Sequence, residues 1–490
     1  MARRPTPLRA LARPQVLSLL LLVALALAPR IGAAAAIATS APSTSAPTVH
    51  LHQKKNAALQ ALISALPKAE LHLHLEGTLE VDLMMRLAAK NNITLPYTDA
   101  AQARASRRDY ASLEPFLAEF RVAMRTLRRR TDFQELAAAY LKRAAENNVR
   151  RAEIFVDLQT HVRNGVAQDD VIAGIMAAIR AASSPDHAPQ PIEAALILCF
   201  VRDFGPRAAF TTALRASRFY QSFIGVGLAS AEKGFPPAPF APTYKLAKMA
   251  GLHRVAHAGE EGGPEYVWQA LDDLGVERVD HGVRAIEDPK LVAALRERRI
   301  PLTVCPLSNR ALKVYDGQLQ QRMRQLFLES GDDLLLTINS DDPAYFAPPP
   351  PTATTQKTMA TATATTTMTG EEKDGQEKRN SEGESEEAAE REQEAEEQYG
   401  YLNANYRFIA ELVGLTPEQL LRLAQRSLNA SFWPEEKKRA VVEEAEGAYQ
   451  AWVRGVQGEA YREAVAALEH QETVAVAALE YQETEAVAAS

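Results

Sequence analysis

Apolar and polar positions alternate regularly over the middle of the chain. From Ala57 to Phe346, short runs rich in Val, Ile and Leu are separated by longer amphipathic stretches. Short apolar runs predict buried strands, whereas apolar residues that recur at helical spacing predict helices. We expect strands at Glu70–Leu75, Arg151–Val156, Ala194–Phe200, Ile224–Gly227, Arg254–Ala258, Val279–Gly282, Leu302–Cys305 and Leu334–Ile338. We expect helices between them, for example at Phe133–Glu146, Asp169–Ala182, Pro264–Leu274 and Pro289–Arg298.

This order of elements predicts the fold class. Strands that alternate with helices form parallel sheets. About eight such units over roughly 280 residues are typical of an α/β protein with a (β/α)8 TIM-type barrel. A doubly wound open sheet is the alternative, but no GxGxxG motif follows the first predicted strand.

Polar residues that can bind a metal or move protons fall at the carboxyl ends of the predicted strands. The end of a barrel where these strand ends meet is where active sites lie. Side chains alternate along a strand, so His72 and His74 face the same way. Three imidazoles and a carboxylate suit one divalent metal, above all zinc. The residues concerned are His72, His74, His257, Glu260, His281, Asn309, Asp341 and Asp342.

Five ordered motifs resemble the adenosine/adenine deaminase family, and most of all its fungal and bacterial adenine deaminase branch. The resemblance covers about residues 66–346 and resumes at 399–452. The motifs are LPKAELHLHLEGTLE (66–80), AHAGEE (256–261), VDHGVR (279–284), LTVCPLSNRALKVY (302–315) and SDDPAYF (340–346). The family implies a zinc-containing barrel of the metal-dependent hydrolase kind, which hydrolyses the 6-amino group of a purine and releases ammonia.

The resemblance also assigns roles. It implies one Zn²⁺ per subunit, and its protein ligands would be His72, His74, His257 and Asp341. Glu260 would protonate the ring nitrogen N1, with Glu232 the next candidate for this acid. His281 would orient the hydroxide generated at the zinc and stabilise the developing charge.

The expected substrate is free adenine, converted to hypoxanthine. Asp342 resembles the family residue that reaches N7 of the purine. Glu76 stands where adenosine deaminases usually carry a shorter, ribose-contacting Asp, and Ser230 lies in a stretch that also fits the adenine branch. Ala229 and Ala231 depart from that branch and put this choice in doubt. The alternatives are adenosine or an N6-modified adenine nucleotide as the substrate, and a secreted barrel that acts as a binding or growth-factor-like protein.

Composition changes this picture little. The net charge of −7 is concentrated in residues 371–398, which carry −9 and leave the remainder near +2. The sequence has no basic stripe of the kind that would indicate nucleic acid binding. Cys199 and Cys305 lie in apolar runs and are expected to be buried thiols rather than a disulfide.

The segments outside the barrel have distinct compositions. We expect a leader and linker over 1–55, a barrel over 56–346 and 399–455, a disordered acidic insertion over 347–398, and a helical repeat-like tail over 456–490. The Arg-rich start and its 13-residue apolar run resemble a secretory signal and are short for a membrane span. A mitochondrial transit peptide, or the cytoplasmic or nuclear location usual in the family, is the alternative. The sequence does not predict the oligomeric state.

Overall fold

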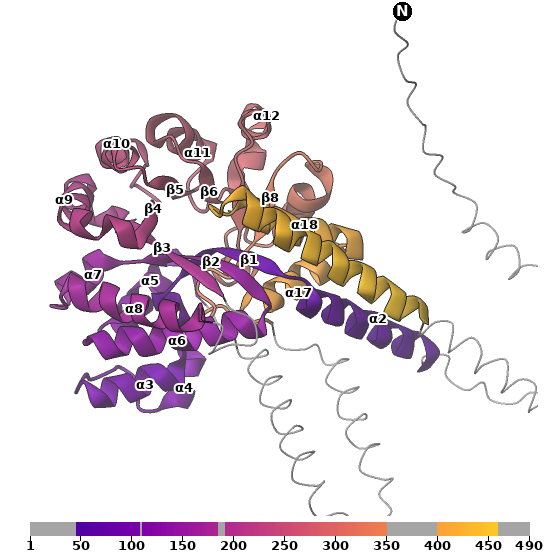
Figure 1. Ribbon diagram of the computed structural model, residues 1–490, viewed down its shortest axis with the longest axis horizontal. Helices are drawn as coiled ribbons and strands as arrows, with labels where there is room; N and C mark the ends of the chain where they lie inside the picture. Colours follow the sequence, from indigo (N-terminus) through magenta and orange to yellow (C-terminus); the bar gives the residue numbers. More distant parts are fainter. Residues whose placement is uncertain (1–45, 108–109, 185–191, 350–398, 459–490) are drawn as a thin grey trace, which may run out of the picture. The chain divides into compact units, whose positions relative to one another are not determined.

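A computed structural model describes residues 46–107, 110–184, 192–349 and 399–458. All eight predicted strands are present and the barrel is confirmed (Figure 1). They lie in one compact unit, Lys55–Ser490, whereas the unit Met1–Lys54 is described only for the start of α2. The strands are β1 (Lys68–His74), β2 (Val149–Val156), β3 (Glu193–Val201), β4 (Phe223–Ala229), β5 (His253–Ala258), β6 (Arg278–His281), β7 (Leu302–Val304) and β8 (Leu336–Ile338).

Each strand pairs in parallel with the next one along the chain, in the order β1 to β8. A parallel bridge between Leu73 and Asp341 joins the chain just after β8 to β1. There the N–H of Asp341 donates to the carbonyl of His72, and the N–H of His74 donates to the carbonyl of Asp341, both at 3.0 Å. This pairing closes the ring beside the predicted metal ligands.

Helices follow the strands and cover them. The long helices α6 and α8 lie side by side (Figure 1). Their apolar faces are buried because each presents an apolar stripe at helical spacing. The α-helices are α2 (Ala46–Ala65), α3 (Val81–Lys90), α4 (Ala100–Ser106), α5 (Leu113–Met124), α6 (Arg130–Glu146), α7 (Leu158–Arg163), α8 (Gln168–Ala182), α9 (Pro206–Ala216), α10 (Ala241–Met249), α11 (Pro264–Gln269), α12 (Pro289–Arg298), α13 (Pro306–Ala311), α14 (Leu319–Arg324), α17 (Leu402–Val413) and α18 (Pro417–Ala430).

The structure modifies one predicted helix and shows helices after residue 399. The helix expected over Pro264–Leu274 is α11 followed by a π-helical turn, Ala270–Leu274, which ends at Gly275 with φ +64°. After residue 399, α18 packs against β1 and β8, and a last helix follows over 435–458. The chain beyond the predicted insertion therefore contributes to the barrel.

Several expectations fall outside the described residues. The leader over residues 1–45, the insertion over 350–398 and the tail over 459–490 belong to this group. The predicted domain boundaries stay a prediction. Among the described helices, none combines the length and apolar character that a membrane crossing requires.

Buried charges stabilise the barrel interior opposite the strand ends that carry the histidines. Arg278, the first residue of β6, donates to Glu153 on β2 at 2.8 Å and to the carbonyl of Leu71 on β1 at 3.1 Å. Arg151 also donates to Glu153 at 3.1 Å. Arg278 and Glu153 are fully buried, so their charges depend on each other rather than on water.

Replacing Arg278 by Met should therefore destabilise the fold strongly. The change leaves the buried Glu153 carboxylate with Arg151 as its remaining cation, and breaking a buried pair costs about 3–5 kcal/mol. Arg298→Met is the matched control, because the Arg298–Asp272 pair is largely exposed and such a pair contributes about 0–1 kcal/mol. Denaturant unfolding measures both variants. Equal stabilities would show that the Arg278 pair is not a structural requirement.

Candidate metal centre and active site

The predicted site residues sit where strands turn sharply into loops. Ser230, His281 and Asp341 follow or end β4, β6 and β8 and have φ of +80°, +62° and +63°. This left-handed region is uncommon for residues other than glycine, and it often occurs where function requires a particular side-chain direction. At these three positions, the turn of the backbone therefore sets the direction of a side chain at the mouth of the barrel.

The four predicted ligands converge on one point. The candidate donor atoms of His72, His74, His257 and Asp341 all lie within 4.8 Å of one another. The His72 and His74 Nε2 atoms lie 3.2 and 3.5 Å from Asp341 Oδ1, and the Nε2 atoms of His74 and His257 lie 3.1 Å apart. Ligands about 2.1 Å from a tetrahedral zinc ion lie roughly 3.4 Å from each other. The spacing therefore fits one metal ion.

The hydrogen bonds around His72 support the same conclusion. Thr303 Oγ1 lies 2.9 Å from His72 Nδ1 and donates its own hydrogen to Asp280 Oδ1 at 3.2 Å. With its hydrogen used in this way, the hydroxyl accepts a hydrogen bond from Nδ1–H, which leaves the lone pair of the neutral ring on Nε2. That Nε2 is buried without a hydrogen-bond partner, although it faces the Asp341 carboxylate. A metal ion between Nε2 and the Asp341 carboxylate would satisfy both electron-rich atoms.

Burial keeps His74, His257 and His281 neutral. It lowers the pKa of His74 to about 4 and that of His281 to about 3, and it holds the pKa of His257 well below its usual value. Burial alone would raise the pKa of Asp341, but the neighbouring His72 imidazole lowers it. Neutral imidazoles and an ionised carboxylate are the protonation states that metal binding requires.

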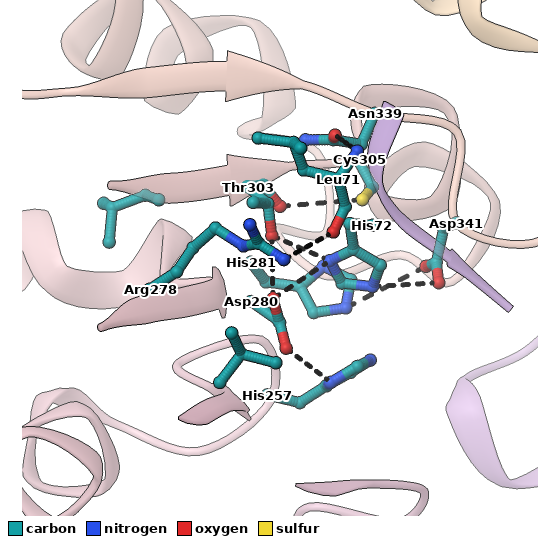
Figure 2. A network of polar contacts seen from close by, with 12 residues as sticks. Leu71, His72, His257, Arg278, Asp280, His281, Thr303, Cys305, Asn339 and Asp341 are labelled. Atoms are coloured by element: carbon teal, nitrogen blue, oxygen red, sulfur yellow. Dashed lines mark hydrogen bonds and ion pairs between the residues drawn. The ribbon is translucent and has the colours of Figure 1, made fainter. Parts of the chain in front are cut away.

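Asp280 is a functional candidate that the sequence reasoning missed. It lies between two ligand histidines, with Oδ2 at 3.4 Å from His257 Nδ1 and Oδ1 at 4.0 Å from His72 Nδ1 (Figure 2). It is fully buried, and neither Asp280 Oδ2 nor His257 Nδ1 has a hydrogen-bond partner of its own. A carboxylate behind a ligand imidazole fixes the tautomer and orients the ring.

Glu260 and His281 lie beside the ligands. Glu260 Oε2 is 3.6 Å from His281 Nε2, which is itself 3.9 Å from Asp341 Oδ2. Burial raises the pKa of Glu260 well above its usual range, and the nearby Asp341 carboxylate raises it further. The geometry therefore offers a protonated carboxylic acid next to the metal position.

Asp342 lies in the same site, and its carboxyl group contacts the carboxylate of the neighbouring Asp341. Burial and the adjacent Asp341 charge hold the pKa of Asp342 well above its usual range. Gly77 permits its placement, since a Cβ at position 77 would lie 1.9 Å from Asp342 Oδ1. Only a residue without a side chain fits there.

These groups line a hollow of about 660 Å³ that is partly open to solvent. Ser230, Glu260, His281, Asp341 and Asp342 contribute to it, as do the ligands His74 and His257. Its apolar wall comes from Leu113, Phe116, Leu117 and Phe120 of α5, together with Val201 and Leu312. The spacing of the α5 residues is typical of a core-facing stripe, which is why the sequence did not single them out.

Glu76 does not line the hollow. It is buried, and its Oε1 lies 2.8 Å from His161 Nε2 on α7 and accepts the backbone N–H of Asp157 at 3.1 Å. The Asp157 side chain does line the hollow, and burial raises its pKa to about 6. Glu76 therefore acts on the pocket through the segment after β2, which the sequence did not predict.

The side of the hollow near Ser230 carries a charged pair. Arg121 on α5 donates to Asp203 at 2.7 Å and to Ser230 Oγ at 3.1 Å. Ala229 lines the hollow, and its methyl group offers no hydrogen bond. Cys199 and Cys305 are free and buried, as expected.

A parallel barrel with three histidines and a carboxylate spaced to bind one metal ion defines a metal-dependent hydrolase. The chain belongs to the adenosine deaminase family, whose model matches residues 67–371. It is 41% identical over 373 residues to adenine deaminase of Streptomyces coelicolor, a match that covers 76% of this chain and 92% of that protein.

Two solved structures have a similar fold. The crystal structure of adenine deaminase from Arthrobacter aurescens matches with a TM-score of 0.64 and 33% identity, covering 79% of this chain and 99% of that one. A zinc-bound amidohydrolase from Burkholderia ambifaria also has a TM-score of 0.64, at 24% identity, and covers 82% of this chain and 95% of that one. The second likeness shows the fold alone.

Asp280→Asn should weaken metal binding without abolishing it. The amide keeps the shape but removes the negative charge behind His257 and His72, and the loss of such a partner typically costs about 10–100-fold in metal affinity. Competition with a chelator measures this change. Asp272→Asn, a largely exposed carboxylate paired with Arg298, is the control and should bind metal like the wild type. Unchanged affinity in Asp280→Asn would assign Asp280 a purely structural role.

Proposed function

We propose that this protein is a zinc-dependent adenine deaminase, which hydrolyses the 6-amino group of adenine to give hypoxanthine and ammonia. The observation that carries the proposal is the cluster of His72, His74, His257 and Asp341 beside the buried acid Glu260. The adenine deaminases to which the chain is similar support the choice of substrate.

Zinc is the metal that this donor set fits best. Three imidazoles and one carboxylate are borderline ligands, which suit zinc better than calcium or magnesium. When bound, zinc makes water acidic enough to supply a nucleophile at neutral pH.

The chain's own residues supply the proton transfers. Glu260 holds a proton because it is buried, and it donates that proton to N1 of the purine. Protonation of N1 draws electrons from C6 and makes that carbon electrophilic. His281, 3.6 Å from Glu260, orients the attacking water and stabilises the charge that develops on it. Once the water oxygen has bonded to C6, the Glu260 carboxylate takes a proton from that oxygen and passes it to the amino nitrogen. The C6–N bond then breaks, ammonia leaves, and the second proton of the water restores the Glu260 acid.

Asp342 and Ser230 orient the base. A buried and protonated Asp342 donates a hydrogen bond to N7, an acceptor that purines have and pyrimidines lack. Ser230 also lines the hollow, and its hydroxyl accepts a hydrogen bond from Arg121. The apolar wall of α5 leaves the faces of the base in a dry environment.

The charges that line the hollow favour a free base over a nucleotide. Among the described lining residues, Arg121 is the one Lys or Arg side chain, and it is paired with Asp203. A phosphate group would therefore find no unpaired cation. Adenosine remains the competing substrate, since Ala229 leaves room in the wall. A binding protein without catalysis would not need Glu260 and His281 beside a complete ligand set.

Glu260→Gln should lower kcat at least 100-fold. The amide keeps the shape of the side chain but has no proton to give to N1, and general acid catalysis contributes about 10²–10⁴-fold. Ammonia release from adenine measures the rate. Metal content should stay at one ion per subunit, which separates loss of the acid from loss of the metal. Near-normal turnover would remove Glu260 from the reaction.

The preference for adenine over adenosine should be roughly 5- to 150-fold in kcat/KM, because making room for a sugar among packed side chains costs about 1–3 kcal/mol. Glu76→Asp withdraws the carboxylate from His161 and from the segment after β2, so the ratio should shift toward adenosine. His161→Gln, which keeps the length of Glu76, is the control and should lower both rates with little change in the ratio. A wild-type preference for adenosine would refute the substrate and leave the zinc site untouched.

A further inference from the structure

One buried carboxylate holds the backbone of the loop that carries Glu260. Glu232 lies just beyond β4 and has no exposed surface. Its Oε2 accepts the backbone N–H groups of Glu260, Glu261 and Gly262 at 3.0, 2.7 and 2.8 Å, and its Oε1 accepts that of Gly259 at 2.7 Å. Four consecutive amides thus point at one side chain, an arrangement that binds anions strongly.

The loop wraps tightly around this carboxylate. A Cβ on Gly262 would lie 2.9 Å from Glu232 Oε1 and 2.4 Å from the ring of Tyr266. Gly259 has φ +74°, and a Cβ there would lie 2.6 Å from Val267. Gly259 and Gly262, which lie on either side of Glu260 and Glu261, are therefore needed to bring all four amides to Glu232.

A buried arginine completes the arrangement. Arg202, which follows β3, lies with Nη1 at 3.9 Å from Glu232 Oε1, and both side chains are fully buried. Its Nη2 donates to the backbone carbonyl of His257. The pair therefore holds both ends of one short segment, with the metal ligand His257 at one end and Glu260 near the other.

We propose that Glu232, backed by Arg202, is a positioning residue that fixes the direction of the Glu260 carboxyl group. This role rests on the proposed deaminase function. Both Glu232 oxygens are used by backbone amides, so Glu232 itself is not the acid, although its place in the sequence made it the next candidate after Glu260. Its contribution comes from geometry, since a misplacement of about 1 Å can cost roughly 100-fold in rate.

Glu232→Gln tests the proposal. A glutamine has one acceptor oxygen and one NH₂ group, so at least one of the four amides would face a donor. We expect kcat for adenine to fall about 10–100-fold. KM should change less than about threefold and metal content should remain at the wild-type level, because neither His257 nor the pocket wall loses a side chain.

Hydrogen exchange followed by mass spectrometry gives a readout that does not depend on activity. In the wild type, the amides of residues 259–262 should exchange slowly because their acceptor is buried. In Glu232→Gln, exchange in this segment should rise at least tenfold while that of β1 and β2 stays unchanged. The matched control is Glu261→Gln, since Glu261 pairs at 3.2 Å with the largely exposed Lys233 and should match the wild type in both assays.

The outcomes separate this proposal from the proposed function. A wild type that releases no ammonia from adenine, but whose segment 259–262 is protected through Glu232, would overturn the function and keep the anchoring role. An active Glu232→Gln variant with wild-type kcat would overturn the positioning role and keep the function. Glu232→Asp retains the charge and withdraws it by one methylene, so it covers the case in which Glu232→Gln does not fold. Wild-type kcat in Glu232→Asp would also overturn the proposal.

Discussion

The pairing of Asp341 with β1 is the interaction on which the rest of the site depends. Its backbone closes the barrel between β8 and β1, through hydrogen bonds on either side of Leu73, and its carboxylate faces His72 and His74. The left-handed φ of +63° reconciles these two tasks by turning the side chain toward the mouth of the barrel. A ligand set spread over more than 260 residues of sequence is therefore assembled by the closure of the sheet itself.

Desolvation then sets the protonation states around that closure. The same burial that keeps His74, His257 and His281 neutral raises the pKa values of Glu260 and Asp342. Neutral imidazoles can bind a metal, and neutral carboxyl groups can donate a proton or a hydrogen bond. One physical cause thus prepares the ligands and the acid together, while Asp341 remains the anion because it lies closest to the imidazoles.

The fold and the ligands could be predicted because their sequence signals are local. The eight apolar runs give the strands, and alternation along β1 places His72 and His74 on one face. Glu76 shows where such reasoning ends. Its place just after the first strand follows from the predicted strand Glu70–Leu75, but the contact that fixes its direction is His161, 85 residues away on α7. A contact between two separate elements produces no periodic pattern in the sequence of either element.

Backbone donors are harder still to predict. The four amides around Glu232 would have the same sequence signal in any Gly-Glu-Glu-Gly loop, and only the fold brings β4 beside the segment after β5. The sequence analysis missed Asp280 for a related reason. Asp280 precedes His281, and the role of His281 already accounted for the motif. In both cases a buried carboxylate orients a group that performs the chemistry. The precision of this site therefore depends on acids that never touch the substrate, and a sequence shows such residues only once the positions of their partners are known.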